Sequence, residues 1–136
     1  MSKRKTGTLV LLIVSALMAG LIVLMAGCSG GKPPEYSSST SPIEVKVGEK
    51  FVISLESNPT TGYQWQLAEP LNTSILELVG SEYKAPETKL VGAGGEERWT
   101  FKAVGEGETK IYLEYARPWE KDVAPAKSET FSVIVR

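Results

Sequence analysis

The side-chain chemistry open to this chain is limited by what its 136 residues lack: it has no histidine and one cysteine, Cys28. Without histidine there is no Ser-His or Cys-His pair and no imidazole to bind a metal. Paired carboxylates occur at Glu96-Glu97 and at Glu106 and Glu108, where they flank expected turns and strands and should be solvated. We therefore expect no enzyme, no cofactor and no metal site.

Three short segments nevertheless carry more chemistry than a turn requires. Residues 58–63 combine Asn, Pro and Gly, which favour a tight turn, with two threonines, which are poor choices for a turn tip. Residues 92–95 almost lack side chains, so their backbone can approach a partner closely. Residues 117–119 contain Arg and Trp, the types enriched at interface hot spots, and we expect the Trp to be exposed.

Each segment also has a simpler explanation when it is taken alone. The first can be an ordinary rigid turn, the second a loose linker, and the third a loop whose Trp folds back on the edge of the domain. Together, on a chain without catalytic groups, they predict a binding surface built from loops.

The elements that position these segments follow from alternating polarity. Apolar residues recur at every second position, which is typical of half-buried strands. Only residues 74–79 leave a choice between a helical turn and a strand. Six to eight strands without helices must form two packed sheets, so we predict an all-β fold, an immunoglobulin-like antiparallel β-sandwich, with a small barrel as the alternative. The alternating runs are residues 43–47, 51–55, 63–67, 99–103, 110–115 and 130–135.

Loop placement follows from that strand order. Connections after alternate strands of a sandwich emerge at the same end, as antibody binding loops do. We therefore expect the three segments to form one composite surface.

The first quarter of the chain does not belong to the sandwich. A basic start at residues 3–5, an apolar run over residues 9–26 and small residues before Cys28 indicate a lipoprotein signal peptide at residues 1–27. Cys28 would then carry a lipid that anchors the protein to the cell membrane. An uncleaved spanning helix or an incidental cysteine are the alternatives. The basic start places the rest of the chain on the extracytoplasmic side in each case.

A flexible linker and one domain make up the remainder. Residues 28–42 are rich in Gly, Pro and Ser and predict a tether, and residues 43–136 form the domain. With no second cysteine, a packed core must stabilise this domain. The chain has net charge −1, and without the three basic residues at its start twelve basic residues face sixteen acidic ones. The scattered basic residues do not predict nucleic-acid binding.

At residues 43–136 the chain resembles the chagasin-like inhibitors of papain-type cysteine peptidases. The ordered triplet of loop motifs carries this resemblance. It implies a reversible, non-covalent inhibitor, expected to be a monomer, whose three loops occlude the active-site cleft of a papain-like peptidase. Loop by loop, the residues it assigns to peptidase binding are Asn58, Pro59, Thr60, Thr61 and Gly62, then Gly92, Ala93, Gly94 and Gly95, then Arg117, Pro118 and Trp119.

The resemblance also implies a role for each loop. Thr60 and Thr61 would sit near the catalytic cysteine, residues 92–95 would pair backbone to backbone along the substrate cleft, and Arg117 and Trp119 would pack on the primed side. The competing hypothesis is a membrane-tethered immunoglobulin-like adhesion or ligand-binding module. A structural lipoprotein subunit is the third, and it would bury Trp119 at a permanent interface.

Overall fold

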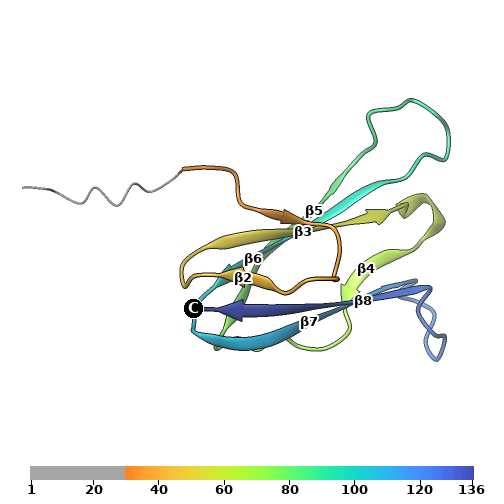
Figure 1. The fold of residues 1–136 in the computed structure, drawn as a ribbon. Coiled ribbons are helices and arrows are strands. Elements are labelled where there is room, and N and C mark those ends of the chain that lie inside the picture. Colours follow the sequence, from red (N-terminus) through yellow and green to blue (C-terminus); the bar gives the residue numbers. More distant parts are fainter. Residues whose placement is uncertain (1–29) are drawn as a thin grey trace, which may run out of the picture. The chain divides into compact units, whose positions relative to one another are not determined.

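The computed structural model describes residues 30–136, which form two four-stranded sheets with a shared core (Figure 1). The strand orders are β1-β3-β6-β5 and β2-β8-β7-β4, so the predicted all-β, immunoglobulin-like sandwich is confirmed. The expected signal peptide and Cys28 lie outside the described residues. The strands are β1 (Glu35–Tyr36), β2 (Ile43–Val45), β3 (Lys50–Ser57), β4 (Gln64–Leu67), β5 (Leu76–Lys84), β6 (Gly95–Ala103), β7 (Gly107–Ala116) and β8 (Lys127–Val135).

Alternating side chains from both sheets build the core. In residues 99–103 of β6, 111–115 of β7 and 131–135 of β8 every second residue is buried, as period-two alternation predicts. Phe51, Phe101 and Phe131 are fully buried, and the rings of Phe51 and Phe101 stack with their centroids 5.5 Å apart. Each such phenylalanine contributes about 1.5–3 kcal/mol by leaving water. This apolar cluster holds the two sheets together without a disulfide within residues 30–136.

The prediction of a purely antiparallel sandwich is wrong at two edges. β1 pairs with β3 in parallel, and β2 pairs with β8 in parallel, whereas the other neighbours are antiparallel. The reason is that β1 and β2, the first two strands in the sequence, belong to different sheets. Neither strand reaches its partner through a short turn, so the antiparallel geometry of a hairpin is not imposed.

The tether expected over residues 28–42 is also shorter than predicted. Glu35 and Tyr36 pair with β3, and the Val52 amide donates to the Pro34 carbonyl at 2.9 Å. The Tyr36 ring packs edge-on against Phe51 at 6.3 Å. The Pro- and Ser-rich composition by itself predicts a flexible segment. Backbone pairing with β3 and the packing of Tyr36 on Phe51 hold residues 35 and 36 in place nevertheless.

The ambiguous stretch at residues 74–79 contains both elements that the sequence allowed. A turn ends at Ile75, whose amide donates to the Asn72 carbonyl at 3.0 Å, and β5 begins at Leu76. After Leu76 every residue of β5 is exposed, and this strand lies at the edge of its sheet. An edge strand that buries almost nothing has no polarity alternation for the sequence to reveal. No helix within residues 30–136 has the length and apolarity needed to cross a membrane.

Candidate functional site

Three loops meet at one end of the sandwich, as predicted: loop 1 (residues 58–63), loop 2 (residues 85–94) and loop 3 (residues 117–126), at the right in Figure 1. Strand register places them there. Ser57 at the end of β3 pairs with Gly95 at the start of β6, and Glu96 pairs with Lys84 at the end of β5. In the other sheet, Tyr115 near the end of β7 pairs with Lys127 at the start of β8.

Loop 1 is a short 3₁₀ turn over Pro59–Thr61. The Thr61 amide donates to the Asn58 carbonyl at 3.1 Å and the Gly62 amide donates to the Pro59 carbonyl at 3.0 Å. Gly62 leaves the turn in the left-handed region with φ 82°, which glycine adopts without steric cost. The backbone N–H of Asn58 donates to the Tyr115 hydroxyl at 2.9 Å and so attaches the loop to the second sheet.

The two threonines have a structural role that the sequence argument missed. The Thr60 hydroxyl donates to Asn58 Oδ1 and the Thr61 hydroxyl donates to the Asn58 carbonyl, each at 2.6 Å. Their presence at the tip is therefore explained by the turn itself, because side-chain hydrogen bonds to a neighbouring residue stabilise such turns. Both residues remain exposed, so their methyl groups and outer faces are free for contact.

Loop 2 passes close to loop 1 on its way into β6. Asn58 Nδ2 donates to the Gly92 carbonyl at 3.3 Å, and a Cβ on Gly94 would lie 3.2 Å from the Ser57 carbonyl oxygen. Gly92 has φ 83°. The left-handed backbone at Gly92 and the close approach of Gly94 to Ser57 therefore both favour glycine.

Gly95 differs from the other three residues of its motif. It is buried as the first residue of β6, and a Cβ there would lie 2.1 Å from the Lys84 carbonyl oxygen. The backbone of Gly95 pairs with Ser57 of β3 on one side, so that side is not open to a partner, whereas β5 ends one residue earlier, where Lys84 pairs with Glu96.

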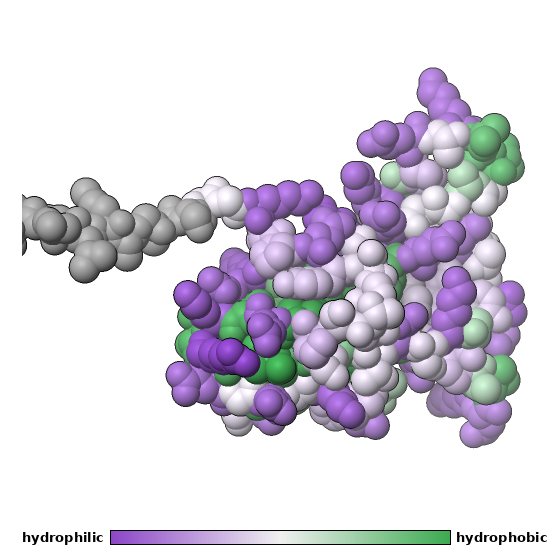
Figure 2. Space-filling view, viewed as in Figure 1, coloured by the Kyte–Doolittle hydropathy of each residue, from purple (hydrophilic) through white to green (hydrophobic). Residues whose placement is uncertain are grey.

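The tip of loop 2 carries two apolar side chains that sequence reasoning passed over. Leu90 is 75% exposed and Val91 is fully exposed. Figure 2 shows this hydrophobic surface at the tip of the loop between β5 and β6. The signal was present in the sequence, since an apolar pair directly before the glycines belongs to no alternating run.

Loop 3 is tied to loop 1 through Arg117. Arg117 Nε donates to the Thr61 carbonyl at 3.1 Å, Nη1 pairs with Glu120 Oε1 at 3.0 Å, and the guanidinium lies 4.5 Å above the Tyr63 ring. The hydrogen bond to Glu120 raises the pKa of Arg117 above its ordinary value, so the group stays charged. The guanidinium thus makes its contacts within the protein, where it connects loop 1 to loop 3.

Trp119 is 66% exposed, as the sequence predicts. Part of its ring covers Gly62, because a Cβ at that position would lie 2.3 Å from Trp119 Cη2. The rest of the indole faces outward. A large aromatic side chain that is held in place on one face and open on the other can bind a partner with little loss of conformational freedom. This exposure excludes a core role for Trp119.

One of the carboxylates that we expected to be solvated is not. Glu97 accepts hydrogen bonds from the Ser57 hydroxyl at 2.7 Å and from the Trp65 amide, whose nitrogen lies 3.2 and 3.3 Å from its two oxygens. It is half-buried and directed toward the interior beneath loop 1, whereas its neighbour Glu96 is exposed.

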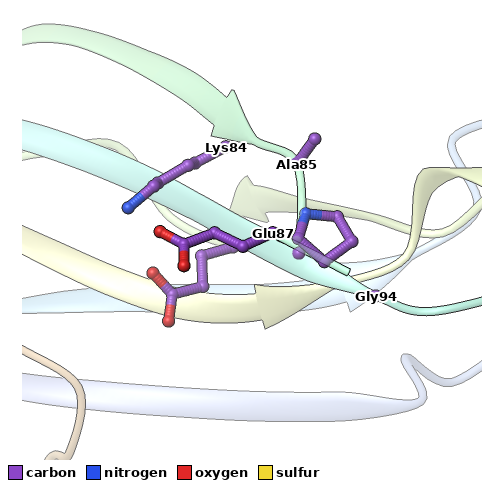
Figure 3. A pocket seen from close by; sticks show the side chains of 7 residues that line it. Lys84, Ala85, Glu87 and Gly94 are labelled. Carbon is purple, nitrogen blue, oxygen red and sulfur yellow. The ribbon is translucent and has the colours of Figure 1, made fainter. Parts of the chain in front are cut away.

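A pocket of about 300 Å³ lies at the base of loop 2, between the end of β5 and the start of β6 (Figure 3). Lys84 and Glu87 both line it, and Glu96 adds a second carboxylate. A small pocket with charges of both signs has no clear ligand preference, and we assign it none. Among residues 30–136 no group of three or more Cys, His, Asp or Glu side chains could hold a metal ion.

Comparison with known proteins agrees with this geometry. Residues 44–135 match the model of the family described as Chagasin family peptidase inhibitor I42. Chagasin of Trypanosoma cruzi is 37% identical over 99 residues, which cover 69% of this chain and 86% of chagasin. Amoebiasin-2 of Entamoeba histolytica is 32% identical over 94 residues, covering 69% and 76%. The crystal structure of the cysteine protease inhibitor EhICP2 from Entamoeba histolytica superposes with a TM-score of 0.63 at 28% identity, covering 79% of this chain and all of EhICP2.

Proposed function

This chain belongs to the chagasin family of peptidase inhibitors, and on that premise we propose that it reversibly and non-covalently inhibits papain-type cysteine peptidases. The observation that carries the proposal is the mutual bonding of the three loops at one end of the sandwich. The description of EhICP2 as a cysteine protease inhibitor supports the class of target. All three loops come from one chain, so the binding surface is complete in a monomer.

Loop 1 enters the catalytic centre of the peptidase in this proposal and is not cut there. The carbonyl oxygens of Asn58, Pro59 and Thr61 already accept hydrogen bonds within the protein. Cleavage requires a carbonyl that is free to enter the oxyanion hole at the geometry of attack. Three of the four carbonyls of residues 58–61 are therefore held away from the geometry of attack, which favours filling the site without cleavage, and none of the residues carries an electrophilic side chain.

Loops 2 and 3 supply the flanking contacts. Leu90 and Val91 offer apolar side chains from the tip of loop 2, and Trp119 offers the open face of its indole. Because Arg117 and Asn58 join the three loops before binding, little conformational entropy is lost on docking. The occluded surface then extends on both sides of the catalytic centre.

Titration of papain with residues 30–136 tests this function. We expect stoichiometric inhibition at micromolar concentrations that is reversed on dilution and leaves the inhibitor uncut, as followed by mass spectrometry. Trp119→Ala should weaken inhibition with little change in Tm, because the side chain is mostly exposed. The absence of inhibition at micromolar concentration would exclude the proposal for this enzyme class.

We also propose that a lipid on Cys28 anchors the protein to the outer face of the cytoplasmic membrane. β1 runs parallel to β3 toward the loops, so the chain enters the domain at the opposite end. Residues 29–34 are all that separate Cys28 from β1, and they span at most about 20 Å. Such a domain would meet peptidases that approach from outside.

Cys28→Ala tests the anchor. We expect this variant to leave the membrane fraction and to inhibit papain as well as the unaltered protein does. If the variant remains in the membrane fraction, the anchor is not a lipid on Cys28.

A further inference from the structure

Glu97 joins the two ends of loop 1 from beneath. It lies in β6, opposite Leu55 of β3, on the side of the strand that faces the second sheet. Its carboxylate accepts the Ser57 hydroxyl at 2.7 Å, directly before loop 1, and the Trp65 amide, just after it. One side chain of the first sheet thus bonds to both chain segments that carry the loop, and one of these belongs to the other sheet.

The groups that Glu97 binds have few alternatives. Ser57 is 2% exposed and Trp65 is 5% exposed, so water cannot readily replace the carboxylate. β4 is an edge strand that pairs only with β7, and the Trp65 amide points away from β7 toward Glu97. A buried amide without an acceptor is strongly disfavoured. The indole of Trp65 adds a second connection between the sheets, since Nε1 donates to the Glu56 carbonyl at 2.9 Å.

The core of the domain does not depend on this connection. Phe51, Phe101 and Phe131 form the buried centre from both sheets, and apolar burial alone holds them together. Loss of the Glu97 carboxylate therefore acts mainly on the loop end of the sandwich. It would change the separation of Ser57 from Trp65, and with it the position of the turn at Pro59–Thr61 relative to loops 2 and 3.

We infer that Glu97 is a positioning residue of the inhibitory surface. By bonding to Ser57 and Trp65, its carboxylate holds loop 1 in the position relative to loops 2 and 3 that insertion into the peptidase requires. The inference rests on the proposed function. Glu97 does not touch the partner, because it lies beneath the loop between the sheets. Its effect on inhibition is exerted through Ser57 and Trp65.

The test compares three variants of residues 30–136 in inhibition of papain. Glu97→Ala should weaken inhibition about tenfold, because an unfastened loop must be ordered on docking. Glu97→Gln keeps an acceptor oxygen and should recover inhibition to within about threefold of the unaltered protein. Val135→Ala removes a buried side chain at the opposite end of the sandwich and should lower Tm while leaving inhibition unchanged.

Amide hydrogen exchange provides a readout that does not need the peptidase. Exchange at Trp65 and Gly62 should accelerate in Glu97→Ala and remain slow in Val135→Ala. If Glu97→Ala does not fold, Ser57→Ala removes one of the two connections and should show the same changes to a smaller degree. Equal inhibition by Glu97→Ala and the unaltered protein, or equal weakening by Val135→Ala, would overturn the inference. Failure of the unaltered domain to inhibit would reject the proposed function, and hydrogen exchange would still test the role of Glu97.

Discussion

Loop 1 and loop 2 lie side by side and are built on opposite principles. In loop 1 three carbonyl oxygens and both threonine hydroxyls are hydrogen-bonded within the protein, and its exit residue is covered by Trp119. In the described residues of loop 2, the tip is held by a few bonds and displays two of the most exposed apolar side chains of the domain. A fixed shape resists cleavage, and an open apolar tip adapts to a pocket. An inhibitor of this design needs both.

The largest effect should come from Gly62→Ala, which disrupts loop 1. The new Cβ would lie 2.3 Å from the Trp119 ring and would sit on a left-handed backbone, so it displaces Trp119 and strains the turn. We expect inhibition of papain to weaken about a hundredfold, which corresponds to nearly 3 kcal/mol. Tryptophan fluorescence should report the displaced indole.

Gly48→Ala is the matched control for that variant. Gly48 has φ 91°, but nothing lies within 4 Å of a Cβ built there, and it is remote from the loops. It should lower stability by about 1 kcal/mol through backbone strain and leave inhibition unchanged. If Gly62→Ala and Gly48→Ala inhibit equally well, contact between Trp119 and loop 1 is irrelevant to function.

The next largest effect should come from removing the apolar tip of loop 2. The double variant Leu90→Ala, Val91→Ala should weaken inhibition about tenfold to thirtyfold, because each side chain buries apolar area only in the complex. Stability should not change, since both side chains are exposed in the free protein. Val47→Ala, 48% exposed at the other end, is the control and should inhibit normally. A loss of inhibition confined to loop 1 variants would mean that loop 2 is only a linker.

A smaller effect should follow from separating the two loops. Asn58→Asp keeps the acceptor for Thr60 but loses the amide that donates to the Gly92 carbonyl. We expect inhibition to weaken about threefold to tenfold, mostly through a faster koff measured by surface plasmon resonance. An unchanged koff would show that the two loops act independently of each other.

The smallest effect on inhibition should come from Glu35, which is remote from both loops. Burial is the largest single influence and would raise the pKa of this carboxyl, but Arg98, whose Nη2 lies 2.8 Å from it, together with Ser54 and Lys32 outweighs burial and leaves the pKa below the usual 4.5. A lowered folded-state pKa stabilises the protein above the unfolded-state pKa, and this contribution disappears as pH falls through the folded-state value. Glu35→Gln should therefore lower Tm at pH 7, lose that difference as the pH falls from 4.5 through the lower folded-state pKa, and inhibit papain normally.

Much of the fold could be predicted from the sequence because most strands bury one face. The spacing of Phe51, Ile53 and Leu55 predicts β3, and similar alternation predicts β6, β7 and β8. β5 and β1 could not be found in this way. β5 is an edge strand exposed along almost its whole length, and β1 depends on the packing of Tyr36 against Phe51. Neither signal is local in the sequence.

The site was predictable in its residues and less so in their roles. Asn, Pro and Gly in loop 1 act as the turn chemistry indicates, and the left-handed Gly62 is one example. The functions of Thr61, Arg117 and Glu97 depend on partners that lie far away in the sequence or on the geometry of the turn itself. Gly95 belongs to the sheet because register assigns it there. Hydrogen bonds between residues that are far apart in the chain produce no local pattern, so a single sequence does not predict them.

By itself the sequence determined the fold class, the absence of histidine chemistry within the chain and the three loop segments, since these depend on composition, alternation and turn-forming residues. Only the tertiary structure decided which side chains face a partner and which hold the loops. Burial and hydrogen bonding between segments make that choice: Trp119, Leu90 and Val91 remain exposed, whereas Arg117, Asn58 and Glu97 bond to neighbouring segments. These contacts form only after the two sheets have packed.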